Sequence, residues 1–145
     1  MTSTPITEAS GTTCALLADR HTVSIEGIRD LLGTAFNSVY TVGDTHSLCE
    51  GAQRLRPNVI VFDISFARSN SLGLIRKIKG ISPGSKLITL TIHDQESAAQ
   101  ISLSAGADAI VLKRCIARDL LEAVDAVQRD ESFISADIGV NSCPG

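Results

Sequence analysis

Short apolar runs alternate with segments of helical periodicity along most of this chain. The runs at 14–18, 38–42, 59–63, 86–91 and 109–112 have the length and composition of strands. Segments 21–36, 45–55, 71–80, 95–105 and 118–128 show the i, i+3, i+4 spacing of helices, although 95–105 is thin in large apolar residues. Five strands alternating with five helices predict a doubly wound α/β domain with a parallel sheet.

Local signals place some of the expected helix ends. Thr45 is the expected N-cap of the helix over 45–55, and Gly80 suits the C-terminal cap of the helix over 71–80. Gly106 should stop the helix that precedes it. The helix count and the connection lengths suit a three-layer, flavodoxin-like (βα)5 fold with a five-stranded sheet. One sequence does not determine the order of the strands, and 2-1-3-4-5 is the order typical of this fold.

The run Val59 to Asp63 is the most informative strand. Four apolar residues in succession indicate burial on both faces of a sheet, yet the run ends on the carboxylate of Asp63. Pro57 and Asn58 precede the strand and a polar stretch follows it, so Asp63 should lie at the carboxyl end of the sheet, where ligands bind. A single aspartate in such a position more often caps the following turn.

The other expected strands also end in polar residues, which favours a functional site at Asp63 over a turn cap. Asp19 and Arg20 follow the first strand, Thr91 ends the fourth and Lys113 follows the fifth. In the order 2-1-3-4-5 these side chains converge with Asp63 on one crevice. A carboxylate can act as a nucleophile toward a phosphoryl group, and a hydroxyl and an ammonium group can hold the transferred oxygens. The pattern predicts a phosphoryl-handling site.

Composition restricts the remaining possibilities. The chain has 145 residues, 43% hydrophobic and 20% charged, which fits one globular domain at 12–135, with a disordered arm at 1–11 and a tail or linker at 136–145. The formal net charge of −3 does not favour binding to nucleic acid or to an anionic membrane, because both are negatively charged. DNA contact would therefore need a segment outside this sequence. Nothing resembles a secretion signal or a membrane span, which favours the cytoplasm.

Cysteine and histidine spacing offers no further chemistry. The four cysteines lie too far apart in sequence for a zinc knuckle or a redox pair, and we expect each of them to be a thiol that forms no disulfide. The three histidines are scattered and predict no metal site. These residues are Cys14, Cys49, Cys115, Cys143, His21, His46 and His93.

From about residue 14 to 135 the chain resembles the receiver domains of bacterial two-component response regulators, in the branch linked to a C-terminal helix-turn-helix DNA-binding domain. The segments that carry the resemblance are Leu16–His21, Pro57–Ser65, Ile88–His93, Ala105–Ala107, Leu112–Lys113 and Asp130–Ser135. The resemblance implies phosphoryl transfer from a histidine kinase to Asp63. It also implies Mg²⁺ held by an acidic pair after the first strand, by Asp63 and by the backbone carbonyl of Ser65. Thr91 would move toward the phosphoryl group, and the surface of the last two helices would rearrange.

Arg20 departs from that family pattern, because the acid pair is reduced to Asp19 followed by an arginine. Three carboxylates and a lysine would sum to −2, whereas Asp19, Asp63, Arg20 and Lys113 sum to zero. Weak or absent Mg²⁺ binding follows, since Mg²⁺ dehydrates reluctantly even in acidic sites. Either the Arg20 guanidinium pairs with Asp63, or its long stem turns it to solvent.

Further departures weaken the expected switch. Ile110 occupies the position of the family's switch aromatic, and Ile92 is bulkier than the residue usual after the threonine. Ala67 and Ser71 replace a usual proline and glycine. We therefore expect an atypical receiver that controls transcription through an output domain, with weak phosphorylation.

Three alternatives stay open. The first is a module that signals without phosphorylation, by homodimerisation through the face of the helices at 95–105 and 118–128, or by contact with a partner. The second is an enzyme such as a phosphatase with an aspartyl-phosphate intermediate, for which Ile64 and Ser65 supply no general acid. The third is a flavin or nucleotide carrier, for which residues 19–24 contain no glycine to cradle phosphate.

Overall fold

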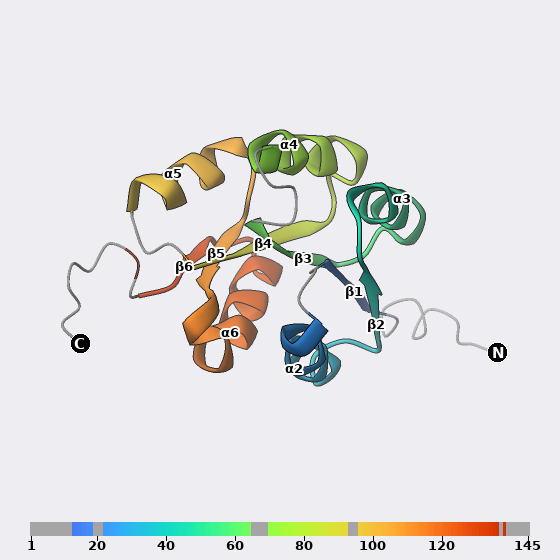
Figure 1. Cartoon of the computed structure of the whole chain (residues 1–145), viewed down its shortest axis with the longest axis horizontal. Coiled ribbons are helices and arrows are strands. Elements are labelled where there is room, and N and C mark those ends of the chain that lie inside the picture. Colours follow the sequence, from blue (N-terminus) through green and yellow to red (C-terminus); the bar gives the residue numbers. More distant parts are fainter. Residues whose placement is uncertain (1–12, 19–21, 65–69, 93–95, 137, 139–145) are drawn as a thin grey trace.

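The computed structural model describes residues 13–18, 22–64, 70–92, 96–136 and 138. Its elements follow one another as the sequence predicts, with one strand added at the end. They are β1 (Cys14–Ala18), α2 (Thr22–Gly33), β2 (Ser38–Val42), α3 (Thr45–Leu55), β3 (Val59–Asp63), α4 (Ser71–Ile81), β4 (Lys86–Thr91), α5 (Glu96–Ala105), β5 (Ala109–Leu112), a 3₁₀ turn (Lys113–Cys115), α6 (Ile116–Gln128) and β6 (Phe133–Ile134). Helices α3, α4 and α5 cover one face of the sheet, and α2 and α6 cover the other (Figure 1).

The sheet is parallel, with the strand order β2-β1-β3-β4-β5-β6. The order of the first five strands is the predicted one, but the prediction of a five-stranded sheet is wrong because β6 adds a sixth strand beside β5. After α6 the chain reverses at Asp130, whose φ of 62° is left-handed, and Lys86 Nζ lies 2.6 Å from the Asp130 carboxylate. This turn brings Phe133 and Ile134 beside Ala109 and Ile110.

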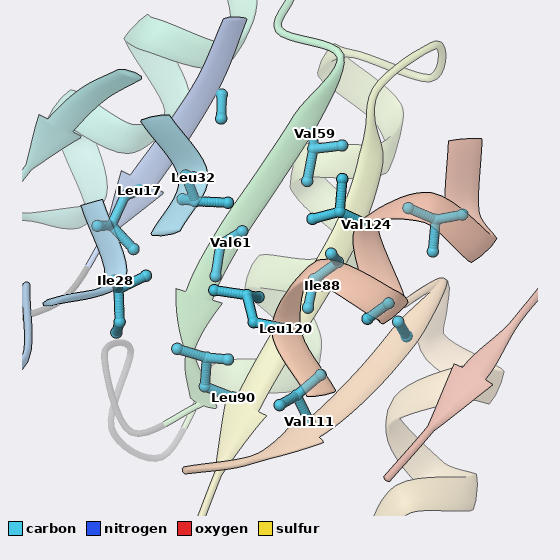
Figure 2. Packing of buried hydrophobic residues seen from close by; sticks show 14 of the residues in the cluster. Leu17, Ile28, Leu32, Val59, Val61, Ile88, Leu90, Val111, Leu120 and Val124 are labelled. Carbon is cyan, nitrogen blue, oxygen red and sulfur yellow. The ribbon is translucent and has the colours of Figure 1, made fainter. Parts of the chain in front are cut away.

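Apolar side chains pack on both faces of the sheet. On the face of α2 and α6, strand residues such as Val61, Ile88 and Val111 contact Ile28, Leu32, Leu120 and Val124 (Figure 2). On the face of α3, α4 and α5 the buried side chains include Leu16, Phe62, Ile75 and Ile78. Strands buried on both sides explain why their sequences are continuously apolar rather than alternating. Each fully buried side chain of this size contributes roughly 1.5–3 kcal/mol relative to an exposed one.

Several helix ends differ from the sequence-based expectation. The N-cap of α3 is Asp44, whose Oδ1 accepts a hydrogen bond from Ser47 N at 2.7 Å, so the prediction of Thr45 is wrong by one residue. Gly80 lies inside α4, which continues to Ile81, so the predicted glycine cap is also wrong. Gly106 does end α5, and its φ of 125° is accessible mainly to glycine.

Two further expectations concern cysteines and membranes. Cys14, Cys49 and Cys115 form no disulfide, as predicted, and Cys143 lies outside the described residues. Of the helices that the structure describes, none has the length and apolar character that a bilayer crossing requires.

Candidate functional site

Asp63 and Lys113 meet at the carboxyl end of the sheet. Asp63 is the last residue of β3 and is 3% exposed, and Lys113 directly follows β5. Lys113 Nζ donates to Asp63 Oδ2 at 2.5 Å, and both side chains are largely removed from solvent. Since β4 separates the two strands, the lysine side chain spans the end of β4 to reach the carboxylate.

Thr91 ends the strand between them. In the sheet register Asp63 is opposite Leu90, and Thr91 is opposite Leu112, the residue before Lys113. Thr91 is 6% exposed. The strand order therefore gathers three of the predicted site residues, a carboxylate, a hydroxyl and an ammonium group, at one edge of the sheet.

The chemistry of this group follows from burial and charge. A buried carboxylate is costly unless it is paired and hydrogen-bonded, and the Lys113 ammonium group provides a charge-assisted bond. A carboxylate held in this way can attack a phosphoryl donor. The lysine and the threonine hydroxyl can then stabilise negative charge on the transferred oxygens.

Two isoleucines near the site differ in their surroundings. Ile110 is 1% exposed and belongs to the apolar cluster under α4 and α5. Ile92, directly after Thr91, is 70% exposed. Most of the Ile92 surface therefore faces solvent, whereas Ile110 is enclosed in the core.

Comparison with known families shows which family this chain is part of. The model of the response regulator receiver domain matches residues 15–125. The chain belongs to this family. The match spans β1 to α6 and includes Asp63, Thr91 and Lys113.

Curated relatives support the assignment at low identity. The transcriptional regulatory protein DegU of Brevibacillus brevis is 30% identical over 121 residues, which are 82% of this chain and 51% of DegU. The nitrate/nitrite response regulator protein NarL of Escherichia coli K12 is 26% identical, over 83% of this chain and 56% of NarL. The chain thus spans about half the length of these relatives.

Solved structures agree with the fold. The isolated receiver domain of RcsB from Salmonella enterica serovar Typhimurium, in the presence of the phosphomimetic BeF3−, superposes with a TM-score of 0.74 at 26% identity. The superposition covers 88% of this chain and 96% of the RcsB domain.

The remaining predicted site residues, Asp19, Arg20 and Ser65, lie outside the described residues. The structure therefore describes neither the predicted Arg20–Asp63 pair nor the metal ligands beside Asp63. Within the described part of the receiver, no three histidine, cysteine or carboxylate side chains gather into a metal site. Of the predicted metal ligands only Asp63 is described, so metal binding stays a prediction.

The receiver also has a buried polar cluster that the sequence did not indicate. Ser135 is 1% exposed and Asp119 is 3% exposed. Ser135 Oγ accepts from Leu112 N at 3.0 Å and donates to the Asp119 carboxylate. The Arg118 guanidinium, and to a lesser degree Ser135, hold the pKa of Asp119 below its usual value. Neither residue stands out in sequence, because a polar residue in the first turn of a helix, or after a two-residue apolar run, is ordinarily exposed.

Proposed function

We propose that this receiver domain accepts a phosphoryl group from a histidine kinase on Asp63 and thereby regulates a transcriptional output. The observation that supports this most directly is the buried ion pair of Asp63 and Lys113 beside Thr91, at the carboxyl edge of a parallel sheet. Of the relatives, DegU is named a transcriptional regulatory protein and NarL a nitrate/nitrite response regulator protein, which supports a regulatory output.

The transfer would exchange one bond for another. An Asp63 carboxylate oxygen attacks the phosphorus of a phosphohistidine, so that an O–P bond forms as the N–P bond breaks. The electron pair of the broken bond stays on the imidazole nitrogen, which takes a proton from solvent. The acyl phosphate carries more negative charge than the carboxylate did, and Lys113 is placed to offset it. Thr91 supplies a hydroxyl donor at the same edge.

Mg²⁺, when bound, would neutralise charge on the donor and on the transferred group. Its ligands in this chain would be Asp19, Asp63 and the carbonyl of Ser65. We propose that it binds weakly, because the side chains of Asp19, Asp63, Arg20 and Lys113 sum to zero charge. Slow and incomplete phosphorylation is the expected consequence.

Intact mass measurement after incubation with phosphoramidate, with and without Mg²⁺, tests this function. We expect a slow gain of one phosphoryl group, which peptide mapping after borohydride trapping places on Asp63. Asp63→Asn is the matched control and should take no label. Label on Asp19 would contradict the proposed acceptor, and rapid stoichiometric labelling would contradict the weak site.

A second candidate function is signalling without phosphorylation, through dimerisation or partner contact. The buried Ile110 favours it, because an aliphatic side chain replaces the family's mobile aromatic within a filled core. Complete absence of label under all donor conditions, in a folded protein, would support this candidate over the first. In both cases we assign DNA contact to an output domain, since this chain has a net charge of −3.

A further inference from the structure

The segment that leaves α6 is fixed to the end of β5 by Ser135. Ser135 N donates to Ile110 O at 2.9 Å, which continues the ladder between β6 and β5. The Ser135 side chain then accepts a hydrogen bond from Leu112 N, two residues further along β5, at 3.0 Å. A hydroxyl oxygen thus takes the place of the carbonyl that a longer β6 would have offered.

Asp119 is a second partner of that hydroxyl. A serine hydroxyl has one proton to donate and lone pairs to accept with. Leu112 N donates to the hydroxyl oxygen at 3.0 Å, and a hydrogen bond from the hydroxyl contributes to the lowered pKa of Asp119. Asp119 is held in turn by Arg118, whose Nε and Nη2 donate to its two oxygens at 2.8 and 3.0 Å.

Leu112 is the last residue before the site lysine. Its amide is fixed by Ser135 on one side of β5, and the strand pairs with Thr91 on the other. The next residue, Lys113, reaches Asp63 with a bond of 2.5 Å. The backbone from which the lysine side chain starts is therefore held from both sides.

We propose that Ser135 is a positioning residue for Lys113: through Leu112 it holds the end of β5 so that the lysine lies against Asp63. The exit segment thereby becomes part of the phosphoryl-acceptor site. The positioning itself concerns the ion pair of the unmodified protein, and only its effect on labelling rests on the function proposed above.

Ser135→Ala is compared with Ser85→Ala in the whole chain. Ser85 is also buried, at 2% exposure, and its hydroxyl donates to Pro57 O at 2.5 Å, near the amino end of β4 and away from Lys113. Both variants lose one buried hydroxyl, so both should melt somewhat below wild type. Labelling by phosphoramidate is then measured over a range of donor concentrations.

We expect Ser135→Ala to lower the maximal labelling rate by about tenfold, because small displacements of a positioned group are costly. The donor concentration for half-maximal rate should change little, since Lys113 acts on charge that grows during transfer. Ser85→Ala should label at the wild-type rate. Asp119→Asn keeps an acceptor oxygen without its charge and should have a smaller effect than Ser135→Ala. Equal rates in Ser135→Ala and Ser85→Ala would overturn the proposal.

A wild type that takes no label would refute the proposed function without deciding the positioning role. In that event the ammonium signal of Lys113 in ¹⁵N NMR spectra decides it. A hydrogen-bonded ammonium group exchanges slowly and gives a sharp signal. We expect this signal in wild type and in Ser85→Ala, and its broadening in Ser135→Ala. A sharp signal in Ser135→Ala would overturn the proposal.

Discussion

At the scale of single residues, the charge balance around Asp63 decides how the acceptor site can work. The Lys113 ammonium group already neutralises the Asp63 carboxylate within a largely buried pair. The charge of any other side chain near this neutral pair therefore decides whether the site attracts or repels a cation. Arg20 is the residue whose charge differs from the family pattern, and its replacement tests this balance.

Arg20→Asp should create Mg²⁺ binding and reduce stability without metal. The side-chain sum returns from zero to −2, which attracts a hard dication, and in the absence of metal the added carboxylate is repelled by Asp19 and Asp63. Thermal melts of wild type and variant, each with and without millimolar Mg²⁺, measure both effects. If Mg²⁺ stabilises wild type as much as the variant, Arg20 does not control metal binding. Arg20→Gln, which removes charge without adding any, should fall between the two.

Asp119 provides a pH dependence of stability. Its pKa is lowered in the folded state by Arg118 and by Ser135, so folding is favoured by its ionised form. This contribution is present above the unfolded pKa of about 3.9 and is lost as the pH falls through the lower, folded pKa. Asp119→Asn should be less stable than wild type at pH 7 and should lose less stability between neutral pH and the acid range. Urea unfolding at several pH values measures this, and parallel curves for the two proteins would contradict it.

At the scale of elements, the bounds of the strands were predicted more accurately from the sequence than the caps of the helices. A strand buried on both faces needs an unbroken apolar run, so the bounds of β1, β3 and β4 follow from the sequence. Caps depend on one backbone conformation, and Asp44 and Thr45 are both suitable cap residues. Only the extended backbone of Asp44, with φ of −146°, shows which of them is used.

The missed strand β6 has a different cause. It has two residues, too few for any periodicity, and it forms because β5 leaves an open edge beside the turn at Asp130. The same limit applies to the candidate site. Strand-end positions predicted Asp63, Thr91 and Lys113 because a parallel sheet aligns its carboxyl ends, whereas Ser135 and Asp119 meet only through the docking of β6.

The α3 cap gives a prediction at this scale. Asp44→Ala removes the acceptor of the Ser47 amide and should lower the melting temperature by a few degrees, as loss of an N-cap does. Thr45→Ala, one residue later, is the matched control and should melt close to wild type because Thr45 is not the cap. Circular dichroism melts compare the three proteins. A larger loss in Thr45→Ala than in Asp44→Ala would contradict the assignment.

At the scale of the whole molecule, the two edges of the sheet are formed by strands of different length, β2 and β6. β2 forms one edge, with Tyr40 45% exposed, while β6 covers β5 at the other edge, between α5 and α6 (Figure 1). The expected association face, on α5 and α6, lies beside the edge that β6 covers (Figure 1). Ile101 of α5, 52% exposed, is a large apolar side chain on one of these helices.

Association should not depend on phosphorylation. A family switch needs an aromatic side chain that changes position, but here Ile110 is 1% exposed in a filled cluster, and a packed core resists rearrangement. We expect sedimentation profiles of the chain to be the same with and without phosphoramidate, and the same for Asp63→Asn. Ile101→Lys should weaken any dimer by placing a charge on α5, whereas Tyr40→Lys, at a comparably exposed position on β2, should leave it unchanged. A monomer-to-dimer step on addition of donor would show that the switch operates through side chains other than an aromatic at position 110.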